Sequence, residues 1–429
     1  MTALIGLQAL VFYGLPIINQ NEALAVFPAN RLFEAGLELF LFGASMTAGW
    51  WIVFNQVRPS RPFGFRAFSF LEGGSGFNLA TLGQVMLFLG VAFQIATTQR
   101  WLSFLPGGIF PVVRAVADAL GLAGGLISAF MIARGAVKGF GIIRFWLLYA
   151  IYSLLIISNY TLFPASSMLI AVCFGLFLGR GKIPYVFLFI VIAILAVLNL
   201  AKFDMRRAYW ERGQAYAEQR VSDLPDRYSE WISLGWERLL GNDEDSELEE
   251  AQRLSSRVDN LVILLRAQSF ILDKDYAKLN GETYWLIPPL FIPRFLWPNK
   301  PRTHEGMVIL NTHFGQQTRE DSLVTYISWG LLPEAYANFG PFFGAISLGL
   351  ALGIGLGWLE WWSRDFPLAS FQSMVVLTFT VNCAASFESV ASVWLTSVFQ
   401  MIITMGIGLW AFTEFRRLPK PQVYQSRNG

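Results

Sequence analysis

Apolar runs of about 20 residues recur along this chain, and they constrain its fold more than any other feature. An α-helix needs about this many apolar residues to cross the hydrocarbon core of a bilayer. The 429 residues are 54% hydrophobic and only 14% charged, whereas a soluble domain carries about 25% charged residues. The pattern therefore predicts an all-α polytopic membrane protein.

Ten membrane spans are predicted, and the Lys and Arg residues between them predict the topology. The spans lie at residues 3–18, 32–54, 75–97, 116–133, 142–159, 162–178, 184–201, 337–359, 368–387 and 393–413. Cytoplasmic connections carry an excess of Lys and Arg. With the N-terminus inside, the short connections on that side hold thirteen of these residues, and the short outside connections hold three. We therefore expect both termini in the cytoplasm.

Four regions follow from this topology. They are a group of about seven helices (1–201), a large extracytoplasmic loop (202–329), about three further helices (330–413) and a cytoplasmic tail (414–429). The first apolar run lacks a basic leader and an A-x-A-like cleavage site, so we expect a retained helix. The long loop holds sixteen Lys or Arg against twenty Asp or Glu, so any anion site in it has to be local.

Several function classes lack their sequence signatures. The chain has no Walker loop, no dinucleotide glycine fingerprint and no H-E-x-x-H, which argues against ATP-driven transport and zinc proteolysis. Cys173 and Cys383 lie in apolar spans, where cysteine behaves as a small hydrophobic residue. We expect no cofactor, no metal and no nucleic-acid partner.

The segment from Gly281 to Gly340 is the most informative polar part of the chain. It places Arg294, Lys300 and Arg302 within nine residues, among five prolines. Proline fixes its own φ and lacks a backbone donor, so a stiff, irregular loop is predicted. Arginine matches phosphate with two parallel bonds, which predicts a pyrophosphate site, with Arg257 joining from the preceding helix. The alternative is that these cations pair with interfacial lipid phosphates.

Both histidines of the chain, His304 and His313, lie in this segment. Histidine titrates near neutral pH and serves as a general base. Plain surface residues are the simpler interpretation. Two histidines also resemble half a metal site, but no carboxylate or thiol stands at matching spacing.

Glu334 lies where the chain re-enters the membrane, and it is the first candidate for a general base. A carboxylate there is unfavourable unless it is paired or functional, although a helix N-terminus would also favour it. Tyr336 and Asn338 add hydrogen-bonding groups close by. Glu34 and Glu38, near the outside end of the second span, could face a cavity or mark the membrane interface, and the interface is the favoured interpretation.

Two motifs in this segment carry a family resemblance. They are G-x-x-Y followed by I-P-R-F-L-W-P-N-K-P, and P-E-x-Y-x-N-F-G at the opening of an apolar helix. The matching residues are Gly281, Tyr284, Pro293, Arg294, Trp297, Pro298, Lys300 and Pro301, then Glu334, Tyr336, Asn338 and Gly340. The chain resembles the bacterial oligosaccharide repeat-unit polymerases, the Wzy-type O-antigen and exopolysaccharide polymerases. About sixty residues carry the resemblance, and elsewhere only the overall plan is similar.

The resemblance implies an inverting, metal-independent glycosyltransferase of the integral-membrane GT-C type in the bacterial inner membrane. Donor and acceptor would be undecaprenyl-pyrophosphate-linked oligosaccharides, with a chain-length regulator protein as a further partner. Arg294, Lys300 and Arg302 would hold the pyrophosphate, with Arg257 as a weaker candidate. Glu334, then His304 or His313, would accept the proton of the acceptor hydroxyl.

Glycan contacts would come from Tyr284, Trp297, Tyr336 and Asn338, although anchoring at the membrane interface explains aromatic residues there equally well. The nearest alternative function is an O-antigen ligase of the same fold class, which His313 keeps open. A transporter or flippase for lipid-linked glycans is a second alternative. It would need ionisable residues and broken helices in related halves, and the sequence shows no such symmetry.

Overall fold

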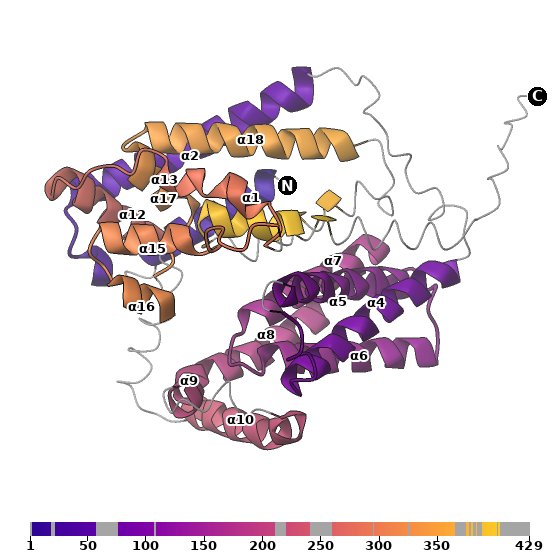
Figure 1. The fold of residues 1–429 in the computed structure, drawn as a ribbon. Helices are drawn as coiled ribbons and strands as arrows, with labels where there is room; N and C mark the ends of the chain where they lie inside the picture. Colours follow the sequence, from indigo (N-terminus) through magenta and orange to yellow (C-terminus); the bar gives the residue numbers. More distant parts are fainter. Residues whose placement is uncertain are drawn as a thin grey trace, which may run out of the picture. The chain divides into compact units, whose positions relative to one another are not determined.

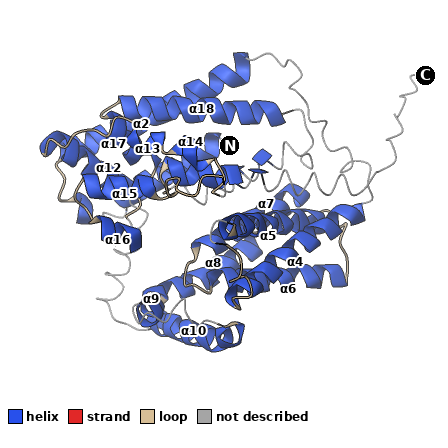
Figure 2. Cartoon of the chain, in the orientation of Figure 1, coloured by secondary structure: helices blue, strands red, loops and turns tan. Residues whose placement is uncertain are grey.

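Helices are the only regular secondary structure in the part of the chain that the structure describes, and loops and turns connect them (Figure 2). The computed structural model describes residues 2–18, 22–56, 76–106, 109–210, 220–240, 260–294, 296–324, 327–364, 375–376, 379–380, 383, 388–400 and 402–403. The chain forms two compact units. The first comprises Met1–Pro62, Asn242–Arg364 and Asn382–Phe399, and the second comprises Phe63–Gly241, Asp365–Val381 and Gln400–Gly429.

Five helices among the described residues are long and apolar enough to cross a membrane. They are Ala29–Asn55, Leu79–Thr98, Val112–Ala133, Phe140–Ile157 and Phe343–Ser363, and shorter apolar helices lie at Ile5–Ile18, Pro164–Arg180 and Tyr185–Leu200. The prediction of a helical membrane protein is confirmed. Each of the first seven predicted spans falls on one helix, and the eighth (337–359) falls on two, Leu331–Phe339 and Phe343–Ser363. Most of 368–387 and of 393–413 lies outside the described residues. The count of ten spans stays a prediction.

The second unit is a bundle of apolar helices with a polar extension. Its helices are α4 (Gly76–Thr98), α5 (Phe110–Ala133), α6 (Phe140–Ile157), α7 (Phe163–Arg180), α8 (Tyr185–Leu200), α9 (Lys202–Trp210) and α10 (Leu224–Leu240). α5 packs against both α4 and α7. A Cβ on Gly175 of α7 would lie 2.4 Å from the Leu126 carbonyl oxygen of α5, so glycine permits this close approach of two backbones.

The polar extension of this unit contains an amphipathic helix, α10. Trp231 is buried, and its indole N–H donates to the Leu198 carbonyl oxygen of α8 at 2.7 Å. Trp236 is exposed. α10 thus packs against α8 with one face only.

The first unit combines membrane helices with most of the polar segment. It contains α1 (Thr2–Ile18), α2 (Ala29–Gln56), α12 (Asn260–Gln268), η3 (Ser269–Asp273), α13 (Glu282–Trp285), α14 (Ile287–Leu290), α15 (Glu305–His313), α16 (Arg319–Val324), α17 (Leu331–Phe339) and α18 (Phe343–Ser363). Residues 391–400 form a further helix. Short helices and turns therefore occupy the predicted irregular loop.

α2 and α18 lie side by side along their length, as Figure 1 shows. A Cβ on Gly353 would lie only 2.0 Å from the Met46 carbonyl oxygen, so the two backbones touch where glycine stands. Further along, the Trp50 indole N–H donates to Glu360 at 2.6 Å. Contacts advance in the same direction on both helices, so α2 and α18 run parallel.

The structure divides the polar region differently from the sequence prediction. The segment 202–329 is predicted as one loop, but α9 and α10 belong to the second unit and α12–α16 to the first. The four predicted regions differ in the side of the membrane on which they lie, and the division into two compact units does not test that side. The span predicted at 337–359 consists of two helices. Gly340 (φ 80°) and Phe342 (φ 61°) adopt positive φ, which interrupts the helix between α17 and α18.

Candidate functional site

Glu334 is buried at the centre of the first unit and caps a helix. It lies on α17, it is 0% exposed, and its Oε2 accepts the backbone N–H of Ala391 at 2.6 Å. Ala391 is the first residue of the helix 391–400, whose free N–H groups favour a carboxylate. Glu334 also lies in the first turn of its own helix, α17, the position that the sequence analysis gave as the structural explanation, whereas the contact with the helix 391–400 was not predicted.

The second carboxylate oxygen of Glu334, Oε1, accepts no backbone N–H among the described residues. Burial raises the pKa of Glu334 to about 7, although hydrogen bonds from the Ala391 N–H and the Thr283 hydroxyl oppose the shift. Protonated and ionised forms are thus both populated near neutral pH, as an efficient general base requires.

Asn338 fastens α17 to the turn that begins α13. Its Nδ2 donates to the Thr283 hydroxyl and to the Glu334 carbonyl oxygen, both at 2.8 Å, and its Oδ1 accepts the Gly281 N–H at 3.1 Å. The backbone of Asn280 donates to the Asn338 carbonyl oxygen at 2.9 Å. Since Asn338 is fully buried with both amide hydrogens engaged, it holds the neighbourhood of Glu334 in place.

Tyr284 brings a hydroxyl into the same neighbourhood. Its ring stacks on Phe339 with centroids 5.4 Å apart. Burial raises the pKa of Tyr284 well above its ordinary value, and the charge of Glu334 raises it further. The hydroxyl has no hydrogen-bond partner among the described residues. Tyr284 thus adds a neutral hydroxyl near the carboxylate.

The segment that precedes α15 lies against the helix that Glu334 caps. The Ser392 hydroxyl donates to the Thr303 carbonyl oxygen at 3.1 Å. A Cβ on Gly306 would lie 3.2 Å from Ser392 Oγ and 3.7 Å from Thr283 Cβ. His304, between them, is partly buried, and burial lowers its pKa. The backbone on both sides of His304 therefore lies against the helix terminus that Glu334 caps.

The predicted cations hold their own loop together. Arg294 donates to the carbonyl oxygens of Pro298 (3.3 Å) and Pro301 (3.4 Å). Lys300 Nζ donates to the carbonyl oxygens of Leu290 (2.7 Å) and Ile292 (2.5 Å).

These bonds leave part of the cationic surface open to a ligand. Burial lowers the pKa of Lys300, and the charge of Arg294 lowers it further. Arg294 uses two of its five N–H donors on the loop. The side chains of Arg302 and Trp297 are exposed.

His313 lies apart from His304, because the two occupy opposite ends of α15. Nine residues of helix span roughly 13 Å. The His313 Nε2 lies 2.7 Å from the Ala277 carbonyl oxygen, and the ring packs edge-on against Tyr276 and Phe314. The two histidines therefore cannot serve one reacting centre together.

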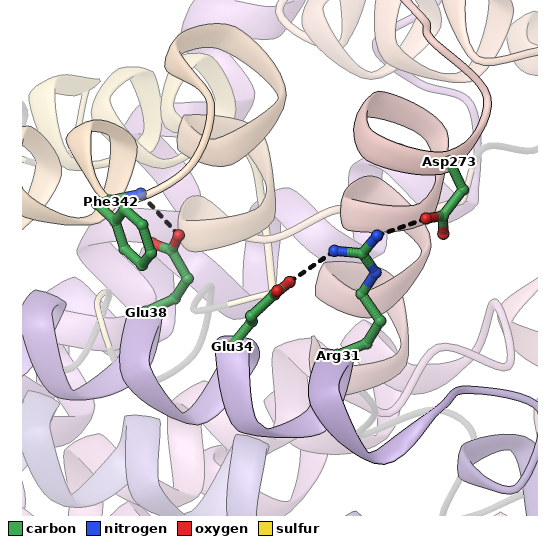
Figure 3. A network of polar contacts seen from close by, with 5 residues as sticks. All are labelled: Arg31, Glu34, Glu38, Asp273 and Phe342. Atoms are coloured by element: carbon green, nitrogen blue, oxygen red, sulfur yellow. Dashed lines mark hydrogen bonds and ion pairs between the residues drawn. The ribbon is translucent and has the colours of Figure 1, made fainter.

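A charged network at the start of α2 was missed by the sequence analysis (Figure 3). Arg31 pairs with Glu34 at 2.7 Å and also with Asp273 of η3. Glu38 is 1% exposed, and its Oε1 accepts the Phe342 N–H at the start of α18 at 2.7 Å. Glu38 was interpreted as a membrane-interface residue, yet it is buried and caps a helix. The i,i+3 spacing of Arg31 and Glu34 in the sequence could have predicted their ion pair.

The remaining predicted site residues lie apart from Glu334 or outside the described part. Tyr336 is buried, and burial followed by the charges of Glu38 and Glu34 raises its pKa. It thus faces the network of Figure 3. Arg257 lies outside the described residues. Across the described ranges, no three His, Cys, Asp or Glu side chains are grouped to hold a metal ion.

Comparisons with known proteins return no match. No protein-family model, no curated protein and no solved structure is significantly similar to this chain.

Proposed function

We propose that this chain is a glycosyltransferase that polymerises undecaprenyl-pyrophosphate-linked oligosaccharide repeat units at the outer face of the bacterial inner membrane. Apolar helices support the membrane location. The observation that carries the proposal is the convergence on the N-terminus of the helix 391–400. Glu334 binds Ala391, and Ser392 binds the carbonyl group of Thr303, directly after the cationic loop.

In the proposed reaction, an acceptor hydroxyl attacks the anomeric carbon of the donor sugar. The new bond joins this carbon to the acceptor oxygen, and the bond to the pyrophosphate oxygen breaks with inversion. The hydroxyl proton passes to Glu334 Oε1. Fixed donors that meet developing charge contribute about 3 kcal/mol each, which is the role proposed for Arg294, Lys300 and Arg302.

The enclosure of Glu334 makes the reaction depend on a local opening. Glu334 is 0% exposed, so an acceptor hydroxyl reaches Oε1 only when the turn 281–284 or the segment 301–306 shifts. His304 is the second candidate base. Its lowered pKa keeps the imidazole neutral at pH 7, and its ring is less deeply buried than Glu334.

Glu334→Gln and Arg302→Gln test this proposal in purified, detergent-solubilised protein supplied with lipid-linked repeat units. The glutamine amide would still offer an oxygen to the Ala391 N–H but could not accept the proton, so transfer should fall by about 10²- to 10⁴-fold. Arg302 is exposed, so its loss should weaken donor binding without disturbing the loop.

Glu38→Gln is the matched control, because Glu38 is also buried and also caps a helix. It should retain transfer activity. Transfer at the wild-type rate by both Glu334→Gln and Arg302→Gln would reject the proposed site.

An O-antigen ligase is the alternative, with lipid A core as the acceptor. A deletion strain separates the two activities. Loss of a polymerase leaves lipid capped with a single repeat, whereas loss of a ligase accumulates long carrier-linked polymer. Elongation in detergent without an ion gradient would exclude a flippase.

A further inference from the structure

A pocket of about 410 Å³ lies in the first unit, beside the end of α12. Ligand pockets commonly measure about 300–1,000 Å³. The lining residues used below are Arg266, Ser269, Phe270, Lys274 and Gln316. Phe27, which precedes α2, also lines it, so the pocket lies at the same end of α2 as the Arg31 network (Figure 3). None of these residues belongs to the Glu334 site.

The backbone at the pocket has an uncommon conformation. α12 continues directly into η3, a π-helical turn over Ser269–Asp273. π-Helical turns are rare and often mark functional sites. The turn places Ser269 and Phe270 on the pocket and sets Lys274 directly after it.

Two cations border the pocket without a carboxylate partner in the part of the chain that the structure describes. Arg266 and Lys274 are both exposed, and neither forms an ion pair with a described carboxylate. Asp273, next to Lys274, is engaged by Arg31 (Figure 3). Lys274 Nζ lies 5.0 Å from the centroid of the Phe270 ring. The pocket is therefore positive on one side.

An acceptor atom and an aromatic wall complete the pocket. Gln316 Oε1 is buried and has no hydrogen-bond donor among the described residues, which is unusual for a buried polar atom. The wall is rigid because Phe270 stacks on Phe314 and Phe314 on Trp329, each with centroids 5.2 Å apart. The pocket thus offers cations, an unfilled acceptor and an aromatic residue.

We propose that this pocket binds an acidic sugar residue of the glycan substrate, an inference that rests on the proposed glycosyltransferase function. A sugar carboxylate pairs with the planar fork of Arg266 and with Lys274. A sugar hydroxyl donates to Gln316 Oε1, and apolar C–H groups of the sugar contact Phe270, which lines the pocket. A bare phosphate group would use only the two cations and leave the acceptor and the aromatic wall unused.

Calorimetric titration of the full chain in phosphatidylcholine nanodiscs tests the inference. The probes are trigalacturonate, cellotriuronate and the carboxyl-reduced, neutral form of each. At least one acidic trimer should bind about tenfold more tightly than its neutral form, because a charge-assisted hydrogen bond at a partly exposed site has about that effect. Equal affinity for acidic and neutral forms, or no binding of either acidic trimer, overturns it.

Arg266→Gln and Lys274→Gln should each remove most of this preference. Lys278→Gln is the matched control, since Lys278 is an exposed cation four residues beyond Lys274 that does not line the pocket. If Lys278→Gln weakened the preference for the acidic trimers equally, general surface charge would explain the preference, and the inference would be overturned. Competition by phosphatidylglycerol in the nanodisc would assign the pocket to a lipid headgroup and also overturn it.

This binding measurement requires no transfer reaction. Acidic trimers that bind a protein unable to elongate glycans would refute the proposed function and leave a saccharide site. Elongation without any acid preference would refute the pocket inference alone.

Discussion

Replacing Glu334 by Gln should remove a pH dependence of stability that burial creates. Burial raises the pKa of Glu334 from its ordinary 4.5 to about 7. The native state therefore holds this proton more tightly than the unfolded chain does. The stabilisation is complete below pH 4.5 and is lost as the pH rises to about 7.

The magnitude follows from the two pKa values. They differ by about 2.5 pH units, and one unit corresponds to about 1.4 kcal/mol, so the ionised carboxylate lowers the free energy of unfolding by about 3 kcal/mol. Glutamine is neutral at every pH and still offers an oxygen to the Ala391 N–H. The variant should therefore lack this loss.

Thermal unfolding in detergent at pH 5, 6, 7 and 8, at constant ionic strength, measures the effect. The Tm of the wild type should fall relative to that of Glu334→Gln as the pH rises, by a total on the order of 4 °C. Glu282→Gln is the control, because Glu282 is an exposed carboxylate on the neighbouring helix α13. It should follow the wild-type curve. Parallel curves for the wild type and Glu334→Gln would show that Glu334 has no raised pKa.

Three further predictions follow from the geometry. Gly353→Ala should lower the Tm, because its Cβ would lie 2.0 Å from the Met46 carbonyl oxygen and overpacking costs about 1–3 kcal/mol. Gly43→Ala is the control and should leave the Tm unchanged, because its Cβ would meet nothing within 4 Å. An equal loss of Tm in both variants would contradict the close packing of α2 and α18. Asn338→Leu should lower the free energy of unfolding by about 1–3 kcal/mol, because it leaves the buried hydrogen-bond partners of Asn338 unsatisfied. A variant with the wild-type Tm would show that these hydrogen bonds do not stabilise the fold. The initial rate of glycan transfer should fall about tenfold per pH unit below the pKa of Glu334, and a rate independent of pH between 5 and 7 would exclude this residue as the base.

The local sequence predicted the positions of helices well, because hydropathy over about 20 residues is a local property. α4 begins and ends one residue from the predicted span 75–97, and α8 lies inside the predicted 184–201. The start of α18 was missed by six residues. Gly340 and Phe342 reverse the backbone there, whereas the apolar run continues across them.

The catalytic role of the candidate site stays a prediction. Glu334 was selected because a carboxylate at the edge of an apolar span is unfavourable, and the structure adds that it is buried with a raised pKa. For Glu38, the sequence analysis favoured a place at the membrane interface. Its partner, the Phe342 N–H, is 304 positions away in the chain, so no local pattern could distinguish a buried cap from an interface residue.

The sequence by itself determined that this protein is a helical membrane protein, because the length and polarity of each segment decide whether it crosses a bilayer. It also placed cations, histidines and a carboxylate in one polar segment. Only the tertiary structure decided which polar atoms are already satisfied: Lys300 by carbonyl groups of its own loop, Arg31 by Asp273, and one Glu334 oxygen by Ala391. Desolvation and hydrogen bonding depend on neighbours that folding supplies from distant parts of the chain. Among the described residues, these neighbours leave Gln316 Oε1 without a hydrogen-bond donor.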